Sequence, residues 1–175
     1  VACTEQFGIG LDNKMAWHCP EELALFKERT IDGVLIMGRK TVENLPKLKD
    51  RYIICITRQE KIDMTNFRND VVTCNSLKDA LLLASQLYPD KKVFVAGGGQ
   101  IYNECLNSDN IHHIDKLYIS FMKKDFVAKN KVKCNVSLNI TMFDWVIDQQ
   151  VSYNDFHHWV LLYRPNGEMQ YIDLL

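Results

Sequence analysis

The feature of this chain that most restricts its fold is the alternation of apolar, β-branched runs with helix-like patterns. Strands are predicted at residues 33–37, 51–57, 71–74, 93–96, 116–121, 143–151 and 157–163. Strands that alternate with helices favour an α/β fold, built on a central, mixed but mostly parallel sheet that is flanked by helices. No helical pattern separates the last two strands, so we expect them to form an antiparallel C-terminal hairpin at one edge.

Two helices have clear starting signals. Residues 20–29 begin with Pro20 and two acidic side chains, which suit the first turn of a helix. Ser76-Leu-Lys-Asp79 has the form of a capping box. One apolar stripe follows it, made of Leu77, Ala80, Leu81, Ala84 and Leu87. Val1 to Thr4 has the pattern of a strand interior with no Met before it, so we expect the natural chain to start earlier.

Length and charge limit the classes of function. The chain has 175 residues, of which 47% are hydrophobic, and no repeat or linker divides it, so residues 1–164 are expected to form one domain. Lys and Arg number 21 against 22 Asp and Glu, with both signs scattered, so the chain lacks the basic field that nucleic-acid binding needs. The apolar runs are far too short to span a membrane. We therefore expect no nucleic-acid or membrane partner.

The six cysteines indicate a reducing compartment. They show no Cys-x-x-Cys spacing, and several lie in strand-like runs, where cysteine acts as a small buried hydrophobe. We therefore expect a cytoplasmic protein without a metal site. The adjacent pairs His112-His113 and His157-His158 are not expected to bind metal, because neighbours on a strand point to opposite faces. Surface or edge positions are expected for these histidines.

Two strand-to-helix junctions could bind phosphate. Residues 34–37 lead into Gly38-Arg-Lys-Thr41, and residues 93–96 lead into Gly97-Gly-Gly99. Each junction places backbone N–H groups and the positive end of a helix beyond the carboxyl edge of a strand. Glycines that only permit tight turns would explain either junction alone, but two junctions in one small α/β domain favour a ligand with several phosphates. The three glycines do not match the G-x-G-x-x-G fingerprint of an ordinary Rossmann domain.

Glu22 and Phe26 are four residues apart in the first predicted helix and therefore share one helical face. Phe26 is expected to point inward. A carboxylate beside a buried aromatic ring is costly unless a group pairs with it, which makes Glu22 a candidate functional acid. Spacing alone leaves open the alternative that Glu22 only interacts with the helix dipole at the surface.

A family resemblance extends over nearly the whole chain. It is carried by Gly8-Ile-Gly-Leu-Asp-Asn-Lys-Met-Ala-Trp17, Pro20-Glu-Glu-Leu23, Ile36-Met-Gly-Arg-Lys-Thr-Val-Glu43, Ile56-Thr-Arg58, Phe94-Val-Ala-Gly-Gly-Gly-Gln-Ile-Tyr102 and Leu117-Tyr-Ile-Ser120. In this order, these segments resemble the dihydrofolate reductase family. The resemblance implies NADPH-dependent reduction of 7,8-dihydrofolate to 5,6,7,8-tetrahydrofolate, by hydride transfer to C6 and protonation at N5. It also implies a role in one-carbon metabolism and thymidylate synthesis, and binding of antifolate inhibitors.

The resemblance assigns roles to the residues around the pterin. Glu22 takes the position of the family's single active-site carboxylate, which bonds the 2-amino and N3 groups of the pterin and promotes protonation at N5. Ser120 matches a hydroxyl residue, usually Thr, that supports this carboxylate. Cys3 is implied to offer its backbone carbonyl near the pterin and the nicotinamide.

The rest of the substrate is assigned in the same way. The resemblance implies that Phe26, Leu45 and Leu48 line the aminobenzoyl pocket. Arg51 is implied to hold the glutamate carboxylate of the substrate with its planar guanidinium.

The resemblance implies NADPH as the cofactor, because Lys40, Thr57 and Arg58 fall where the family binds the 2′-phosphate. Met15 is implied to lie in the mobile loop that closes over the nicotinamide. A cis peptide bond is implied between Gly97 and Gly98. The full set of implied cofactor contacts is Ala2, Ile9, Met15, Gly38, Arg39, Lys40, Thr41, Thr57, Arg58, Gly97, Gly98, Gly99, Gln100, Ile101 and Tyr102.

Two other functions compete with this interpretation. A pyrimidine reductase of riboflavin synthesis shares the architecture and the triple-glycine junction, but Glu22 and Arg51 in their family contexts speak against it. A non-catalytic domain that binds folate or a nucleotide is the second alternative, and the intact acid position speaks against that one.

The C-terminal residues suggest a second activity in the natural protein. Pro165-Asn-Gly provides a turn, and Glu168-Met-Gln-Tyr-Ile-Asp-Leu-Leu175 then begins an apolar pattern that resembles the opening of thymidylate synthase. We therefore expect residues 165–175 to be a linker or the start of a truncated synthase domain, within a bifunctional dihydrofolate reductase–thymidylate synthase. The isolated reductase is expected to be a monomer, and the full-length protein a homodimer through the synthase.

Overall fold

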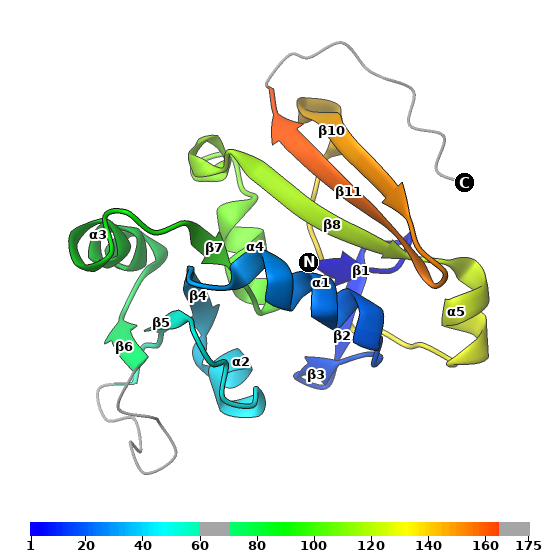
Figure 1. The fold of residues 1–175 in the computed structure, drawn as a ribbon, viewed down its shortest axis with the longest axis horizontal. Helices are drawn as coiled ribbons and strands as arrows, with labels where there is room; N and C mark the ends of the chain where they lie inside the picture. The colour runs from blue at the N-terminus through cyan, green and yellow to red at the C-terminus, as the bar shows by residue number, and fades with distance from the viewer. Residues whose placement is uncertain (60–70, 165–175) are drawn as a thin grey trace. The chain divides into compact units, whose positions relative to one another are not determined.

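The computed structural model describes residues 1–59 and 71–164 of the chain, and Figure 1 shows how they fold. Within these residues the chain divides into two compact units. The first unit contains Val1–Glu22 and the chain from Asn103 onwards, and the second contains Leu23–Tyr102. Helix α1 (Pro20–Thr30) begins in the first unit and continues in the second.

The second unit is built on a parallel sheet with the strand order β6-β5-β4-β7. These strands are β4 (Val34–Gly38), β5 (Tyr52–Ile56), β6 (Val71–Cys74) and β7 (Val93–Val95). The central strand β4 pairs on both sides, with Ile36 opposite Ile54 on one side and Val95 on the other. Residues 34–37 are all fully buried. A continuous apolar run of this kind is what a parallel strand covered on both faces requires.

Three helices follow strands of this sheet. They are α2 (Arg39–Asn44), α3 (Leu77–Leu87) and α4 (Gly99–Cys105). Helix α2 packs against β4 and β5, and α3 packs against β5 and β6. The predicted cap of α3 is confirmed, because the Ser76 hydroxyl accepts a hydrogen bond from the Asp79 backbone N–H at 3.1 Å.

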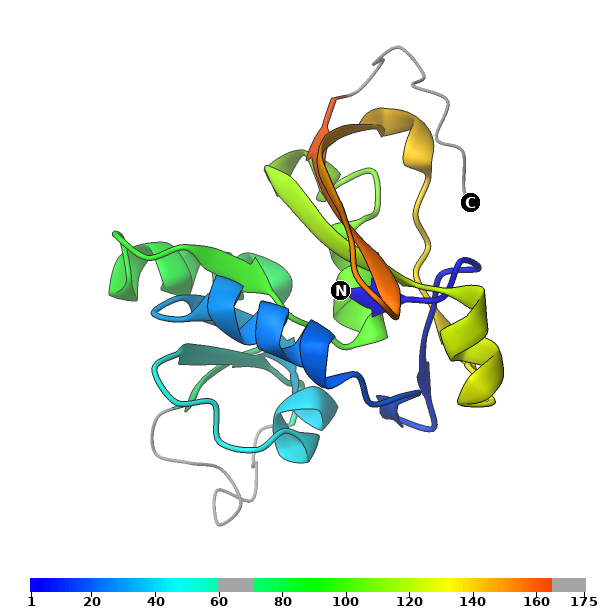
Figure 2. The ribbon, with the colours of Figure 1, turned by 45° about the vertical axis from the view of Figure 1, so that its right-hand side comes forward.

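The first unit holds a mixed sheet with the strand order β1-β8-β11-β10. Its strands are β1 (Ala2–Cys3), β8 (Lys116–Met122), β10 (Trp145–Ser152) and β11 (Phe156–Tyr163). Strand β1 runs parallel to β8, whereas β8, β11 and β10 are antiparallel. Figure 2 shows the strong twist of the β10–β11 hairpin. The predicted C-terminal hairpin is therefore confirmed, with β10 at the edge of its sheet.

A smaller sheet of the first unit joins β2 (Gly8–Leu11), β3 (Lys14–Met15) and β9 (Val136–Ser137) in the order β3-β2-β9. Asp12 and Asn13, with φ of 50° and 64°, form the two-residue turn between β2 and β3, as a tight hairpin requires. The Asn135 amide donates to the Asp12 carboxylate at 2.8 Å. These short strands and helix α5 (Lys124–Lys129) were not predicted from the sequence.

The surface position expected for His112 and His113 is confirmed, because both are exposed, but two other expectations about the histidines are wrong. His112 and His113 lie in a short 3-10 helix, η1 (Ile111–His113), and not in a strand, so alternation does not apply to them. His158 lies on β11 and is only 5% exposed, so the expectation of a surface or edge position is wrong for this residue. Strand β11 pairs with β8 on one side and β10 on the other, which makes it an interior strand of its sheet. The described residues contain no group of three or more His, Cys, Asp or Glu side chains that could hold a metal ion.

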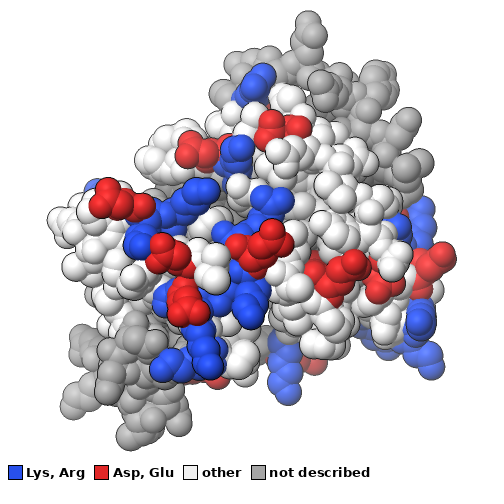
Figure 3. Space-filling model, viewed as in Figure 1, with Lys and Arg blue, Asp and Glu red and all other residues white. Residues whose placement is uncertain are grey.

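Charged side chains of both signs lie next to one another on the face shown in Figure 3. The second unit contains the ion pairs Lys91–Asp32, at 2.7 Å, and Arg39–Glu43, at 2.7 Å. In the part of the chain that the structure describes, no helix has the length and apolar character needed to cross a membrane.

The α/β fold class is confirmed, and each strand predicted from an apolar run is present. Another short 3-10 helix, η2 (Met142–Asp144), precedes β10. The division into a reductase domain at 1–164 and a following segment stays a prediction, since residues 165–175 lie outside the described residues.

Replacement of Ser76 by Ala removes the side-chain cap of α3. We expect Ser76→Ala to lower the free energy of unfolding by about 1 kcal/mol, because the Asp79 N–H loses its acceptor. Ser85→Ala on the same helix is the control, since the exposed Ser85 hydroxyl bonds only the Leu82 carbonyl of its own helix, and its effect should stay within about 0.5 kcal/mol. Urea unfolding of both variants measures the difference, and equal stability of the two would contradict the capping role.

Candidate active site

Glu22, Ser120, Ala2 and Cys3 come together in the first unit, and we call them the carboxylate cluster. The Ser120 hydroxyl donates to the Glu22 carboxylate at 3.2 Å. Ala2 lies directly opposite Ser120 in the β1–β8 ladder, and Cys3 follows it, opposite Phe121. Ser120 itself is only 1% exposed. The predicted partnership of Ser120 with Glu22 is therefore present in the structure.

The local sequence explains the position of Glu22. Pro20 starts α1, so Glu22 lies in the first turn, where backbone N–H groups and the helix dipole favour a carboxylate. Cys3 is fully buried, and burial raises the pKa of its thiol to about 12. The thiol therefore stays neutral beside Glu22.

Two further sequence-predicted residues lie in the first unit. Ile9 is half-buried on β2, and Met15 is 50% exposed on β3. The turn at Asp12 and Asn13 places both residues on one hairpin. The structure thus sets Met15 at an exposed position that a ligand can reach.

Phe26, Leu45 and Leu48 form an apolar wall in the second unit. All three are partly buried and pack against one core cluster, made of Leu35, Met37, Val42, Ile53, Cys55 and Val71. Phe26 comes from α1, whereas Leu45 and Leu48 follow α2. The structure therefore brings together the three residues predicted to line an aminobenzoyl pocket.

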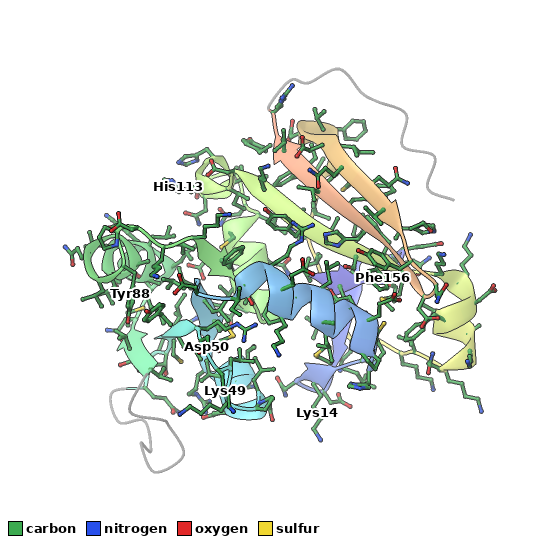
Figure 4. The ribbon with its side chains drawn as sticks, viewed as in Figure 1. Lys14, Lys49, Asp50, Tyr88, His113 and Phe156 are labelled. Atoms are coloured by element: carbon green, nitrogen blue, oxygen red, sulfur yellow. The ribbon has the colours of Figure 1, made fainter. Side chains whose placement is uncertain are left out.

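Arg51 is held in a fixed orientation next to this wall. Its guanidinium donates to the Lys49 carbonyl at 2.7 Å, to the Lys27 carbonyl at 2.7 Å and to the Thr30 hydroxyl at 3.3 Å. Lys49 and Asp50 lie in the loop before β5 (Figure 4). A cavity of about 260 Å³ opens there, lined by Asp32, Lys47, Leu48, Lys49, Asp50, Arg51 and Tyr52. The guanidinium is thus positioned at a cavity wide enough for a carboxylate-bearing ligand.

Thr30 contributes to this arrangement, although it was not predicted from the sequence. The Thr30 hydroxyl also donates to the Phe26 carbonyl at 2.8 Å, so it links the last turn of α1 to Arg51. The strand and helix patterns contain no signal for this contact, because the two residues are 21 positions apart.

The two glycine junctions of the second unit meet at one edge of the parallel sheet, which we call the glycine edge. The Gly38 N–H donates to the Gly97 carbonyl at 2.8 Å. A Cβ atom at Gly98 would lie 3.0 Å from the Thr41 hydroxyl oxygen, so only glycine fits there without displacing Thr41. Strands β4 and β7 are neighbours, and their carboxyl ends carry these junctions. In open α/β sheets, ligands bind beyond the carboxyl ends of the strands.

Gly97 has a backbone conformation that other residues rarely adopt. Its φ is +106°, and its peptide bond to Gly98 is cis, as the family resemblance implied. A side chain at Gly97 would approach the Tyr102 ring at 3.3 Å. Glycine at position 97 therefore serves both the positive φ and the close packing of the Tyr102 ring.

Basic and hydroxyl side chains border the glycine edge. Lys40 and Arg58 are exposed, and Thr57 is buried directly after β5, where its N–H donates to the Cys74 carbonyl at 2.8 Å. Arg39 forms an ion pair with Glu43 on α2. The remaining predicted contacts lie on α4, where Gln100 is exposed and Ile101 is buried against Gly38. Ile101 therefore supports the edge as a core residue.

The comparisons with known proteins agree with this geometry. The dihydrofolate reductase family model matches residues 1–155. The chain belongs to the dihydrofolate reductase family. The dihydrofolate reductase of Buchnera aphidicola subsp. Baizongia pistaciae is 38% identical over 125 residues, which cover 71% of this chain and 69% of that protein. A dihydrofolate reductase from Enterococcus faecalis, complexed with NADP(H) and RAB-propyl, shares the fold with a TM-score of 0.72, at 23% identity, over 95% of this chain and 94% of that one.

Longer, bifunctional members of the dihydrofolate reductase family are also similar to this chain. Bifunctional dihydrofolate reductase-thymidylate synthase 2 of Arabidopsis thaliana is 39% identical over 128 residues, which are 65% of this chain and 22% of that protein. The equivalent protein of Glycine max is 41% identical over 61% of this chain. The chain spans about a quarter of the length of these bifunctional relatives.

Replacement of Gly97 tests the backbone of the glycine edge. We expect Gly97→Ala to lower the free energy of unfolding by about 1–2 kcal/mol, because a Cβ atom disfavours a positive φ. Gly99→Ala is the control, since Gly99 begins α4 and Ala is the better helix former. Thermal unfolding compares the two variants. A Gly97→Ala protein as stable as Gly99→Ala would show that the positive φ is not required.

Proposed function

We propose that this chain is an NADPH-dependent reductase that converts 7,8-dihydrofolate to 5,6,7,8-tetrahydrofolate. The observation that carries the proposal is the buried Ser120 hydroxyl that donates to the carboxylate of Glu22. A carboxylate fixed in this way can accept two N–H hydrogen bonds from the 2-amino and N3 groups of a pterin. Membership of the dihydrofolate reductase family supports the same assignment.

The reaction adds a hydride to C6 and a proton to N5 of the dihydropterin. NADPH supplies the hydride when it is bound. Glu22 orients the pterin and favours protonation at N5 through its charge, which is the work of a general acid–base residue. Cys3 offers its backbone carbonyl, and its neutral thiol adds no competing charge beside Glu22.

The rest of the substrate is assigned to the second unit. We assign the aminobenzoyl group to the apolar wall of Phe26, Leu45 and Leu48, and the glutamate carboxylate to Arg51. The three hydrogen bonds of the guanidinium orient it before the ligand arrives, which lowers the entropy lost on binding. Antifolates that keep the same donor groups and ring system are expected to occupy the same residues.

The glycine edge fits a dinucleotide phosphate. Glycine at position 98 lets the two junctions pack closely, since a Cβ atom there would meet the Thr41 hydroxyl, and the exposed Lys40 and Arg58 supply positive charge. We assign the 2′-phosphate of NADPH to Lys40, Thr57 and Arg58. We assign the pyrophosphate to Gly38, Arg39, Thr41 and the segment from Gly97 to Tyr102. We assign the nicotinamide to Ala2, Ile9 and Met15. The Enterococcus faecalis relative of the same fold is itself complexed with NADP(H).

The whole protein is proposed to be a bifunctional reductase–synthase that acts as a homodimer through its synthase part, as the similarity to the plant bifunctional proteins suggests. We also propose a cytoplasmic location, because the six cysteines are all free thiols and four of them are buried. Sequencing of the gene beyond Leu175 tests the fusion directly.

A spectrophotometric assay tests the reductase activity. Oxidation of NADPH should depend on dihydrofolate and should produce tetrahydrofolate. Oxidation that instead requires a riboflavin precursor would favour a pyrimidine reductase. Tight binding of folate and NADPH without turnover would favour a non-catalytic binding domain.

Replacement of Glu22 by Gln tests the proton-relay role. The amide keeps the shape but loses the charge, so turnover at pH 7 should fall by about 10²–10⁴-fold, with partial recovery in acid, where the substrate is protonated in solution. Glu21→Gln is the matched control, because Glu21 is the exposed neighbour in the same helical turn. Pre-steady-state measurement of hydride transfer follows the effect. Near-normal activity of Glu22→Gln at pH 7 would remove Glu22 from the mechanism.

Neutralisation of Lys40 and Arg58 tests the choice of cofactor. The double variant Lys40→Gln/Arg58→Gln should raise the KM for NADPH by about 10²-fold and leave the KM for NADH nearly unchanged, because NADH lacks the 2′-phosphate. Lys92→Gln serves as the control for lost charge, since Lys92 is exposed and lies just before β7, at the opposite end of the strands. Equal effects of the double variant on both cofactors would contradict the assignment.

A further inference from the structure

His158 lies next to the carboxylate cluster in the first unit, on the side of Ser120. Strand β11 pairs with β8 so that His158 stands opposite Ser120. Directly opposed residues of an antiparallel pair share one face, and the His158 Nδ1 atom lies 3.0 Å from the Ser120 hydroxyl oxygen. Both side chains are buried, with exposed fractions of 5% and 1%. The three side chains of His158, Ser120 and Glu22 therefore form one continuous hydrogen-bonded chain.

The number of hydrogens available to these three side chains determines which atom donates in each hydrogen bond. A serine hydroxyl has a single hydrogen to donate. When Ser120 donates that hydrogen to Glu22, it can only accept a hydrogen bond from His158. His158 must then carry a hydrogen on Nδ1. A His158 ring that lacked this hydrogen would instead compete with Glu22 for the Ser120 hydrogen.

We propose that His158 is a positioning residue, which holds its Nδ1–H on Ser120 and thereby directs the Ser120 hydroxyl to the ionised Glu22 carboxylate. The proposal rests on the reductase function proposed above. Hydrogen bonds in a buried chain strengthen one another, so donation by His158 makes Ser120 a better donor to Glu22. His158 therefore favours the charged form of the residue that binds the pterin, without touching the substrate itself.

The neighbouring side chains of the first unit hold the imidazole in place. The Tyr118 ring, two residues before Ser120 on β8, stacks on the imidazole with 9° between the planes and 6.4 Å between the centroids. Val151 stands opposite His158 on β10. The plane of the ring is therefore set by its packing, which suits a donor that must point at one oxygen.

Two buried thiols of the first unit interact electrostatically with Glu22. Burial raises the pKa of the Cys3 thiol to about 12 and also raises the pKa of the Cys19 thiol. These groups are the same in every variant at position 158. A difference in the pH dependence between such variants therefore reports the change at His158.

The tautomer of His158 is the first measurement. Nitrogen-15 NMR of the full chain, labelled at its five histidines, should show neutral His158 with the hydrogen on Nδ1. His158→Asn identifies the resonance by its disappearance. Ser120→Ala removes the partner and should abolish the preference. A neutral His158 with its hydrogen on Nε2 would overturn the proposal, and this readout does not depend on enzyme activity.

The pH dependence of hydride transfer is the second measurement. His158→Leu removes the donor, so the ionised Glu22 is less favoured and the midpoint of the rate against pH should move up by about 0.5 pH unit. His158→Asn keeps an N–H donor near the Nδ1 position and should hold the midpoint within about 0.2 pH unit of the unmodified chain, by the same reasoning. His157→Leu is the control, because His157 lies next in the strand, opposite Phe121, and points to the other face.

The outcomes separate this proposal from the reductase function. An unmodified chain that cannot reduce dihydrofolate would overturn the function and leave the tautomer measurement as the test of the contact. An active chain in which His158→Leu and His158→Asn share the midpoint of the unmodified chain would overturn the role of His158 alone. A fall in stability of His158→Leu without a shift of the midpoint would show a purely structural residue.

Discussion

The register of β8 is the constraint on which the candidate site depends. Ser120 is paired with Ala2 on one side and with His158 on the other, and it donates to Glu22. A shift of β8 by one residue would turn Ser120 to the opposite face and leave the carboxylate without its donor. A carboxylate is costly to bury without a hydrogen-bond donor. The packing of the sheet and the Ser120–Glu22 hydrogen bond therefore stabilise the same register.

In the second unit, the constraint is that backbone N–H groups must lie close to the phosphates of the proposed cofactor. Strand β4, whose residues 34–37 are fully buried, pairs with β7, so that Gly38 and Gly97 meet through a backbone hydrogen bond. Glycine at positions 97 and 98 permits the positive φ of Gly97 and leaves room for the Tyr102 ring and the Thr41 hydroxyl. Lys40 and Arg58 add charge at positions where the chain leaves the sheet.

Much of this structure could be predicted from the sequence, and the failures have physical causes. Long apolar runs and the Ser76 cap gave correct strands and helices because these signals are local. The short strands β2, β3 and β9 lack such a signal, since their pairing depends on the turn at Asp12 and on Asn135. The burial of His158 was missed because it follows from the register of β11 against β8, and register is a long-range property that one sequence does not specify.

The most direct test of the account is to follow the transferred hydrogen with deuterated cofactor. The chain is mixed with dihydrofolate and NADPH that carries deuterium at C4 of the nicotinamide, and the product is analysed by NMR. The proposed reductase function predicts deuterium at C6 of tetrahydrofolate. Product without deuterium at C6, or no consumption of the cofactor by a folded chain, would contradict it.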